Sequence, residues 1–337
     1  MRIGDFETAD RVLVIAEIGN NHEGRYDVAV DLVDRAADAG VDAVKFQTFR
    51  TEHLLSPADQ ERWARFKRFE LTAEQFGALA EHARRRNLLF ISTPLDLVSA
   101  DVVEPLVDAF KIASGDNTFW PLIDRVASTS KPLLISTGLS GLDEIAETVA
   151  FVAEARHRSR SVGDLALLHC VSSYPVPSED AELGAIEALR GRFPECTVGY
   201  SDHTIGIAAP PLAVALGARI IEKHFTLDKE FSDFRDHALS ADPAEMSELV
   251  FRIREAETIV GERVKRVQSS EEGAALATRR SITAATDLNQ GRRIEAGDLT
   301  WVRPGGGLAP GSERFLIGRR LRRNIRAGET LGTEDVS

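Results

Sequence analysis

The chain has 337 residues, of which 43% are hydrophobic, and its 53 acidic and 41 basic side chains give a net charge of −12. This excess of acids argues against nucleic acid or an anionic membrane as the main partner, although a few lysines can still create a pocket for an anionic substrate. Only Cys170 and Cys196 are present and no CxxC pair occurs, so we expect no disulfide framework, which fits a reducing cytoplasm.

The first eleven residues are polar and charged and lack the apolar core of a secretory signal. No later run approaches the roughly 18 apolar residues of a membrane span. We therefore expect a cytoplasmic protein that is neither secreted nor anchored to a membrane.

Apolar runs typical of buried strands alternate with helical patterns along the first 260 residues. Residues 12–18 form the first such run, and residues 25–39 follow with apolar positions at helical spacing. The further expected strands lie near 43–48, 88–92, 109–113, 132–136, 165–170, 197–200 and 219–224. The further expected helices lie near 72–86, 97–107, 118–130, 141–157, 180–190, 206–216 and 243–260, with Thr72 and Asp143 as helix starts.

Eight strand–helix units predict an α/β protein with a parallel sheet, and they favour a closed (β/α)8 TIM barrel over an open doubly wound sheet. The segment 51–70, which carries Trp63, Phe66 and Phe69, is longer than a usual strand-to-helix connection. Two interpretations of it remain open: a lid over the barrel mouth, or a surface helix that covers the barrel end.

The pattern changes near residue 261. Residues 262–280 are charged and lack clear periodicity, whereas the short runs after them are punctuated by glycine and predict a small, mainly β module. We therefore expect a TIM-barrel domain over 1–261, a linker over 262–280 and a small β domain over 281–337.

Two histidines, His203 and His224, end consecutive expected strands. A parallel barrel brings the carboxyl ends of all its strands to one rim, so both imidazoles should face the same mouth. Neutral imidazoles with open positions beside them suit a divalent ion such as Mn²⁺, Co²⁺ or Zn²⁺, which could polarise a carbonyl. Asp202 and Glu222 flank the pair and could orient the rings or bind a metal-held water. The alternative is that the histidines are ordinary core residues; His22 is a further, weaker candidate.

Lys45 and Lys111 end two other strands, and lysine is rarely buried without a partner. Together with serines of the same rim, they predict a cradle for phosphate and carboxylate groups. The alternatives are that one lysine forms a Schiff base with a substrate, or that the lysines only pair with acids of the rim. The serines are Ser114, Ser136, Ser172 and Ser201. The other rim residues that could transfer protons or bind sugar hydroxyls are Glu17, Gln47, Asp116, Tyr174 and Asp236.

These motifs resemble the sialic acid synthase family, which includes N-acetylneuraminate synthases and enzymes for legionaminic acid, pseudaminic acid and spore-coat polysaccharide. The matching stretches are AEIGNNHEG, DAVKFQTF, FISTP, FKIASGD, PLLISTG, LLHCVSSYPVP, VGYSDHTIG and IEKHFTLD. The tail from SITAATDL to RPGGG resembles the antifreeze-like SAF domain, a β-clip fold. The resemblance covers nearly the whole chain.

The resemblance implies a metal-dependent transferase that forms a carbon–carbon bond. Phosphoenolpyruvate would condense with an open-chain N-acetylhexosamine, either N-acetylmannosamine or a 2,4-diacetamido-trideoxyhexose, to give a nine-carbon 2-keto acid and phosphate. It implies Mn²⁺, or else Mg²⁺ or Co²⁺, on His203 and His224, with Glu17 near the reacting carbons. Arg303 resembles an arginine that the small domain inserts into a partner's barrel, which implies a domain-swapped homodimer.

The remaining site residues divide between the two substrates by the same resemblance. The expected phosphoenolpyruvate contacts are Lys45, Lys111, Ser114, Ser136, Ser172 and Ser201, and the expected sugar contacts are Gln47, Asp116, Tyr174, Asp236 and Arg303. Asp116 departs from the longer Glu of the N-acetylneuraminate enzymes, and residues 230–235 lack the Pro-Gly often found before the Asp-His pair. The alternatives to a synthase are a Schiff-base barrel aldolase and a non-catalytic glycan-binding protein.

Overall fold

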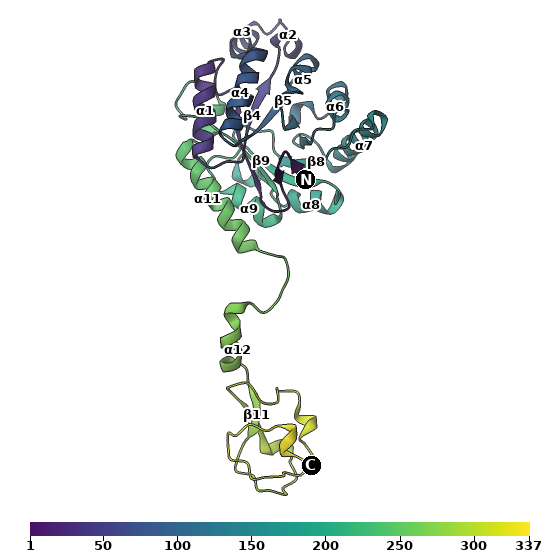
Figure 1. The fold of residues 1–337 in the computed structure, drawn as a ribbon, viewed down its shortest axis with the longest axis vertical. Coiled ribbons are helices and arrows are strands. Elements are labelled where there is room, and N and C mark those ends of the chain that lie inside the picture. Colours follow the sequence, from purple (N-terminus) through teal and green to yellow (C-terminus); the bar gives the residue numbers. More distant parts are fainter. The chain divides into compact units, whose positions relative to one another are not determined.

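The computed structural model describes all residues from Met1 to Ser337, which form two compact units, Met1–Gly261 and Glu262–Ser337. The predicted TIM barrel is confirmed, because eight parallel strands close in the order β10-β3-β4-β5-β6-β7-β8-β9. Helices surround these strands (Figure 1). The segment expected as a linker, 262–280, belongs to the second unit and contains helix α12 (Glu272–Thr278).

All eight expected strands and their helices are present, with their ends shifted by a few residues. The strands are β3 (Leu13–Gly19), β4 (Ala43–Thr48), β5 (Leu89–Pro94), β6 (Ala109–Ile112), β7 (Leu133–Ser136), β8 (Leu165–Cys170), β9 (Thr197–Asp202) and β10 (Ile220–His224). The helices between and after them are α1 (Tyr26–Asp38), α4 (Ala73–Arg85), α5 (Leu97–Val103), α6 (Trp120–Ala127), α7 (Leu142–Ser159), α8 (Ala185–Arg192), α9 (Ala209–Leu216) and α11 (Pro243–Val260).

The two expected helix starts have different outcomes. Thr72 is the N-cap of α4 and forms a capping box with Gln75, as predicted. Asp143 is not a cap, because α7 begins after Gly141 and Asp143 already lies in its first turn. Glu144 takes over the capping role, since its carboxylate accepts a hydrogen bond from the Gly141 backbone N–H.

Each strand divides its side chains between two hydrophobic layers, because neighbouring residues of a strand point to opposite faces. Leu13 and Ile15 of β3 lie in the barrel interior, whereas Val14 and Ala16 pack against the helices. The hairpin of β1 (Arg2–Ile3) and β2 (Phe6–Glu7) places Ile3 in the interior layer. Apolar side chains therefore fill the barrel where its strands begin, and polar side chains can gather only where the strands end.

The long segment after β4 forms two helices, α2 (Thr51–Leu54) and α3 (Gln60–Phe69). Phe66 packs against Phe49 at 5.4 Å between ring centroids, and Phe69 packs edge-on against Phe234 at 5.2 Å. The interpretation as a surface helix on the barrel end agrees with these contacts, and movement as a lid stays a prediction.

The second unit is the small, mainly β domain that the glycine-rich tail predicts. It contains the antiparallel pair β11 (Ser281–Ala284) and β12 (Leu299–Val302), extended by isolated bridges such as Leu288 with Ile325. Its core of short aliphatic side chains includes Ile282 and Leu331. In neither unit is any helix both long enough and apolar enough to cross a bilayer.

Candidate active site

The carboxyl ends of the barrel strands enclose a narrow, polar cavity of about 40 Å³. Its walls come from β3, β4, β5, β6, β7, β8, β9 and β10 or from the residues directly after them, as expected for the catalytic rim of a parallel barrel. The lining residues are Glu17, Lys45, Gln47, Thr93, Lys111, Ala113, Ser114, Ser136, Cys170, Tyr174, Ser201, His203, Glu222 and His224. Most of the site residues expected from the sequence therefore meet in one place.

Two lysines and two glutamates form a buried group of charges at the base of this cavity. Lys45 Nζ lies 2.8 Å from Glu17 Oε2 and 3.6 Å from Glu222 Oε1. Lys111 Nζ lies 3.7 Å from the same Glu222 oxygen, which also accepts a hydrogen bond from Ser201. Because the four charged side chains are at most 5% exposed, their charges act on one another with little screening by water.

Their surroundings move the pKa values of the two glutamates in opposite directions. Burial raises the pKa of Glu17 above its usual value, and the nearby Glu222 carboxylate adds to this effect. Burial also opposes ionisation of Glu222, but the charges of Lys111 and Lys45 outweigh it and lower the pKa of that carboxyl. Such a split assigns the proton to one of two neighbouring acids, so Glu17 is the better proton donor and Glu222 the permanent anion.

The two histidines at the ends of β9 and β10 face each other across the cavity, with ring centroids 5.3 Å apart. His203 Nδ1 lies 2.9 Å from the Val171 carbonyl oxygen; since that oxygen can only accept, Nδ1 carries a hydrogen, and Nε2 is the nitrogen that could bind a metal. His224 Nδ1 is buried without any hydrogen-bond partner, and burial lowers the pKa of this imidazole well below its usual value.

Two neighbouring imidazoles, one with an unpartnered buried nitrogen, fit the ligand set of a divalent transition ion. The chain contains no group of three or more His, Cys, Asp or Glu side chains arranged to hold a metal. An ion held by His203 and His224 alone would therefore keep open positions for substrate oxygens or water.

Two serine hydroxyls lie close to the backbone at Gly138. A β-carbon at Gly138 would lie 2.4 Å from Ser172 Oγ and 2.7 Å from Ser114 Oγ. The hydroxyls of Ser172 and Ser136 are buried and have no hydrogen-bond partner. Ser172 thus belongs to this group although it does not line the cavity. Sequence reasoning missed the part played by Gly138, although it lies in the PLLISTG stretch.

Tyr174 connects the cavity to the loop after β10. Its ring lies 4.2 Å from that of His203, and the Arg235 guanidinium lies 4.6 Å from the Tyr174 ring. Asp236, the first residue of α10 (Asp236–Leu239), follows Arg235 and is 7% exposed, but it does not line the cavity. No sequence signal identifies Arg235, because nothing in a charged loop marks one residue as facing the rim.

Two further expected residues lie outside the cavity. Asp116 is half-buried in the connection after β6, where burial raises its pKa, as it also does for Asp236. Arg303 is an exposed residue of the second unit. Their contacts with a sugar stay predictions.

Asp202 was expected to orient the histidine rings or to bind a metal-held water, and the second of these roles needs correction. Its side chain is fully buried outside the cavity, where it binds Lys223 and accepts a hydrogen bond from the Tyr200 hydroxyl. The reason is the alternation of side chains along a strand, which points Asp202 away from the mouth when Ser201 points into it. His22, the weaker metal candidate, is also buried outside the cavity, with its ring against Phe46.

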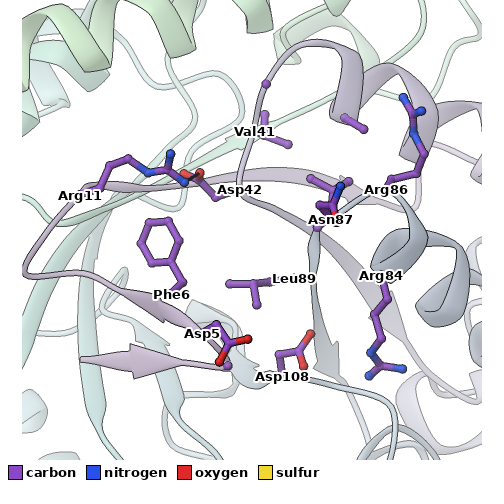
Figure 2. A pocket seen from close by; sticks show the side chains of 14 residues that line it. Asp5, Phe6, Arg11, Val41, Asp42, Arg84, Arg86, Asn87, Leu89 and Asp108 are labelled. Atoms are coloured by element: carbon purple, nitrogen blue, oxygen red, sulfur yellow. Dashed lines mark hydrogen bonds and ion pairs between the residues drawn. The ribbon is translucent and has the colours of Figure 1, made fainter.

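A larger hollow, of about 680 Å³, lies at the other end of the barrel, beside the N-terminal hairpin (Figure 2). Charged side chains line it, and several of them already form ion pairs: Arg11 binds Asp42, and Arg86 binds acids of α1. By volume alone, this hollow would be chosen as the active site. The buried charges and the histidines, however, lie at the opposite rim, where the strands end.

The NeuB family model matches residues 32–265, over most of the barrel, and the SAF domain model matches residues 279–337. The chain belongs to the NeuB family. It is 40% identical to the N,N'-diacetyllegionaminic acid synthase of Legionella pneumophila over 96% of this chain and 94% of that protein. It is 32% identical to a pseudaminic acid synthase of Campylobacter jejuni, covering 99% of both chains.

A crystal structure of an N-acetylneuraminic acid synthetase from Leptospira borgpetersenii superposes on this NeuB-family chain with a TM-score of 0.75 and 34% identity, covering 81% of this chain and 94% of that one. The expected resemblance to sialic acid synthases is therefore confirmed, together with the C-terminal SAF domain. This member of the NeuB family is a sialic-acid-synthase-type enzyme, and the alternative of a non-catalytic glycan-binding protein is set aside.

Proposed function

We propose that this enzyme condenses phosphoenolpyruvate with the open-chain form of an N-acylated amino sugar, either N-acetylmannosamine or a 2,4-diacetamido-trideoxyhexose. The observation that carries the proposal is the buried group of Lys45, Lys111, Glu17 and Glu222 directly beside the pair of histidines in one cavity. That arrangement combines an anion-binding site, a proton donor and a place for an electrophile-activating ion within reach of one another.

The lysines and serines would hold phosphoenolpyruvate. Lys45 and Lys111 supply positive charge, and the unpartnered hydroxyls of Ser136 and Ser172 supply hydrogen bonds to phosphate oxygens. The absence of a side chain at Gly138 leaves room for the hydroxyls of Ser172 and Ser114. Ser114 and Ser201 line the same cavity and complete the proposed set of contacts.

In the proposed reaction, C3 of phosphoenolpyruvate forms a bond to the aldehyde carbon of the sugar, and the aldehyde oxygen takes up a proton. Water adds to C2, from which inorganic phosphate then leaves, so that a nine-carbon 2-keto acid remains. Burial raises the pKa of Glu17, which favours the protonated carboxyl that would deliver its proton to the developing hydroxyl. Glu222, ionised and bound to both lysines, keeps their ammonium groups in place.

His203 and His224 would hold the divalent ion, with Mn²⁺ as the expected metal and Mg²⁺ or Co²⁺ as alternatives. When bound there, such an ion supplies Lewis-acid polarisation of a carbonyl oxygen. Gln47 and Tyr174, at the cavity wall, would bind sugar hydroxyl or amide groups. Asp116 and Asp236 would do so from the surrounding loops.

One observation favours a different mechanism on the same site. Burial lowers the pKa of Lys111, and a neutral buried amine is the form of lysine that attacks a carbonyl to make a Schiff base. A barrel aldolase of this kind would need no metal. Borohydride would trap its sugar or keto acid substrate on Lys111, whereas the condensation that we propose leaves no imine to trap.

The decisive experiment is a panel of acceptor sugars assayed for release of phosphate from phosphoenolpyruvate, with and without a chelator. We expect release only with an N-acylated hexosamine or diacetamido sugar, loss of activity with the chelator, and recovery on adding Mn²⁺. Failure of every acceptor would overturn the proposal. Activity that survives the chelator, together with borohydride trapping, would establish the Schiff-base mechanism instead.

A further inference from the structure

We propose that the buried ion pair of Asp202 and Lys223 is a positioning device that sets the distance between His203 and His224. Each member of the pair directly precedes one of the two histidines in the chain. The inference rests on the proposed metal-binding role of those histidines, and it assigns to both charged residues a function that does not require contact with the substrates.

The pair lies behind the site, between the strands and the helices. Val198, Tyr200 and Ile221 belong to that outer hydrophobic layer, and by alternation Asp202 and Lys223 point into it as well. The side chain of Lys223 is 1% exposed and that of Asp202 is 0% exposed. Neither residue lines the cavity, so neither can touch a substrate bound there.

Both charged groups of the pair make further hydrogen bonds. Lys223 Nζ donates to Asp202 Oδ2 at 2.8 Å and also to the Thr204 carbonyl oxygen. Asp202 Oδ1 accepts from the Tyr200 hydroxyl and from the Thr204 backbone N–H, each at 2.9 Å. The residues on both sides of His203 are therefore fixed to the neighbouring strand.

The pair also fixes the register of the two strands at the site. Lys223 of β10 is the pairing partner of Asp202 of β9, and this is the last paired position before the two histidines. A change in the separation or tilt of these strands would move both imidazoles, because each ring is attached one residue further along. The ion pair resists such a change directly beside the two histidines.

Stability alone does not account for the pair. Two charges buried among apolar side chains lose their hydration, and well-packed hydrophobic residues of similar volume often stabilise a protein equally well or better. Near the rim, no other two neighbouring strands of the barrel are joined by an ion pair on the side that faces the helices. Asp42, a buried acid that also binds a basic side chain, lies at the opposite end of the barrel. A role in holding the histidines explains why charges occur at this position.

The proposal is tested with the single variants Asp202→Asn and Lys223→Met and the double variant Asp202→Leu/Lys223→Met. The double variant leaves no unpaired charge in the core. Arg254→Met is the matched control, because it removes one of the two arginines that bind the buried Asp42 at the other end of the barrel, 2.7 Å away. For each full-length protein we would measure Mn²⁺ affinity by titration calorimetry, and unfolding in urea without metal.

We expect Lys223→Met and Arg254→Met both to lower the unfolding midpoint, but only the former to weaken Mn²⁺ binding, by about 10- to 100-fold. The double variant should recover stability without recovering affinity, and Asp202→Asn, which keeps the shape of the side chain, should show the same loss of affinity. Wild-type affinity in a folded double variant and in Asp202→Asn would overturn the proposal. If the wild-type protein itself does not bind Mn²⁺, the proposed metal role fails first, and the positioning role fails with it.

Discussion

The carboxylate of Glu17 lies 2.8 Å from the ammonium group of Lys45, and both side chains are almost completely buried at the barrel mouth. An anionic substrate that binds Lys45 must compete with this carboxylate. Because burial already raises the pKa of Glu17, the carboxylate can take up a proton as the substrate arrives, which releases the lysine for the new anion. In the proposed reaction, the ion pair would thus link phosphoenolpyruvate binding to protonation of Glu17.

The first prediction concerns Lys45→Met. The change removes the charge but keeps most of the volume, so we expect KM for phosphoenolpyruvate to rise by about 10- to 100-fold, as for the loss of a charged hydrogen bond. KM for the sugar should change far less. Steady-state assays with each substrate varied in turn measure both constants. Lys229→Met, which removes a half-exposed partner of Glu245, is the control, and equal effects on both substrates would argue against the assignment.

The second prediction concerns the space at Gly138. In Gly138→Ala the new methyl group would stand 2.4 Å from Ser172 Oγ and 2.7 Å from Ser114 Oγ, and it would displace hydroxyls that we assign to phosphate binding. We expect KM for phosphoenolpyruvate to rise by about 100-fold or more while the protein stays folded, because the neighbouring serines are small enough to turn away. Gly191→Ala is the matched control, since nothing lies within 4 Å of a β-carbon there. Unchanged kinetics would place the phosphate elsewhere.

The third prediction concerns the two histidines. His203→Ala and His224→Ala should each reduce metal affinity and catalysis together, by about 100-fold or more. His169→Ala provides a control: it also removes a buried strand histidine, but one that points away from the mouth and hydrogen-bonds the Ala181 carbonyl oxygen. That variant should lose stability and keep its affinity for Mn²⁺. Calorimetric titration combined with the phosphate-release assay separates the two kinds of loss.

The sequence was sufficient to predict the barrel because each strand is a short apolar run that a helix follows, and the polar groups end these runs. It also located His203, His224, Lys45 and Lys111 at one rim, since parallel strands bring their carboxyl ends together. The sequence was not sufficient where the prediction depends on the direction in which a side chain points. Asp202 was expected at the mouth because it adjoins His203, yet adjacent strand residues face opposite sides.

Contacts between loops could not be predicted from the sequence either. No periodicity relates the loop after β10 to Tyr174, so the cation of Arg235 over that ring could be found only in three dimensions. Gly138 and Ser172 lie close together although they are 34 positions apart in the chain, and neither local sequence indicates this contact.

The fourth prediction concerns pH. Burial raises the pKa of Asp236 above its ordinary 3.8, so the folded protein holds that proton more tightly than the unfolded chain. Stability from this group is therefore complete below pH 3.8 and is lost as the pH rises through the folded pKa. Asp236→Asn cannot ionise and should avoid this loss, so it should be more stable than the wild type near pH 7, with the advantage shrinking toward about pH 4.

Urea unfolding of both proteins across this pH range measures the difference. The same variant should bind the acceptor sugar more weakly, by about 10-fold or more, if the carboxylate accepts hydrogen bonds from sugar hydroxyls. A stability difference that does not change with pH would show that Asp236 is not forced into a costly ionised state.

The last prediction concerns Arg303 and the proposed domain-swapped homodimer, in which the small domain of one subunit would complete the barrel site of the other. Arg303→Ala should raise KM for the sugar more than KM for phosphoenolpyruvate. If the arginine acts across the dimer, mixing inactive His224→Ala with Arg303→Ala under conditions that exchange subunits should restore activity. Half of the dimers would then be mixed, and one site in each would be intact, so recovery should approach about a quarter of wild-type activity. An arginine that served its own barrel would give no recovery, because no chain in the mixture would carry both intact residues.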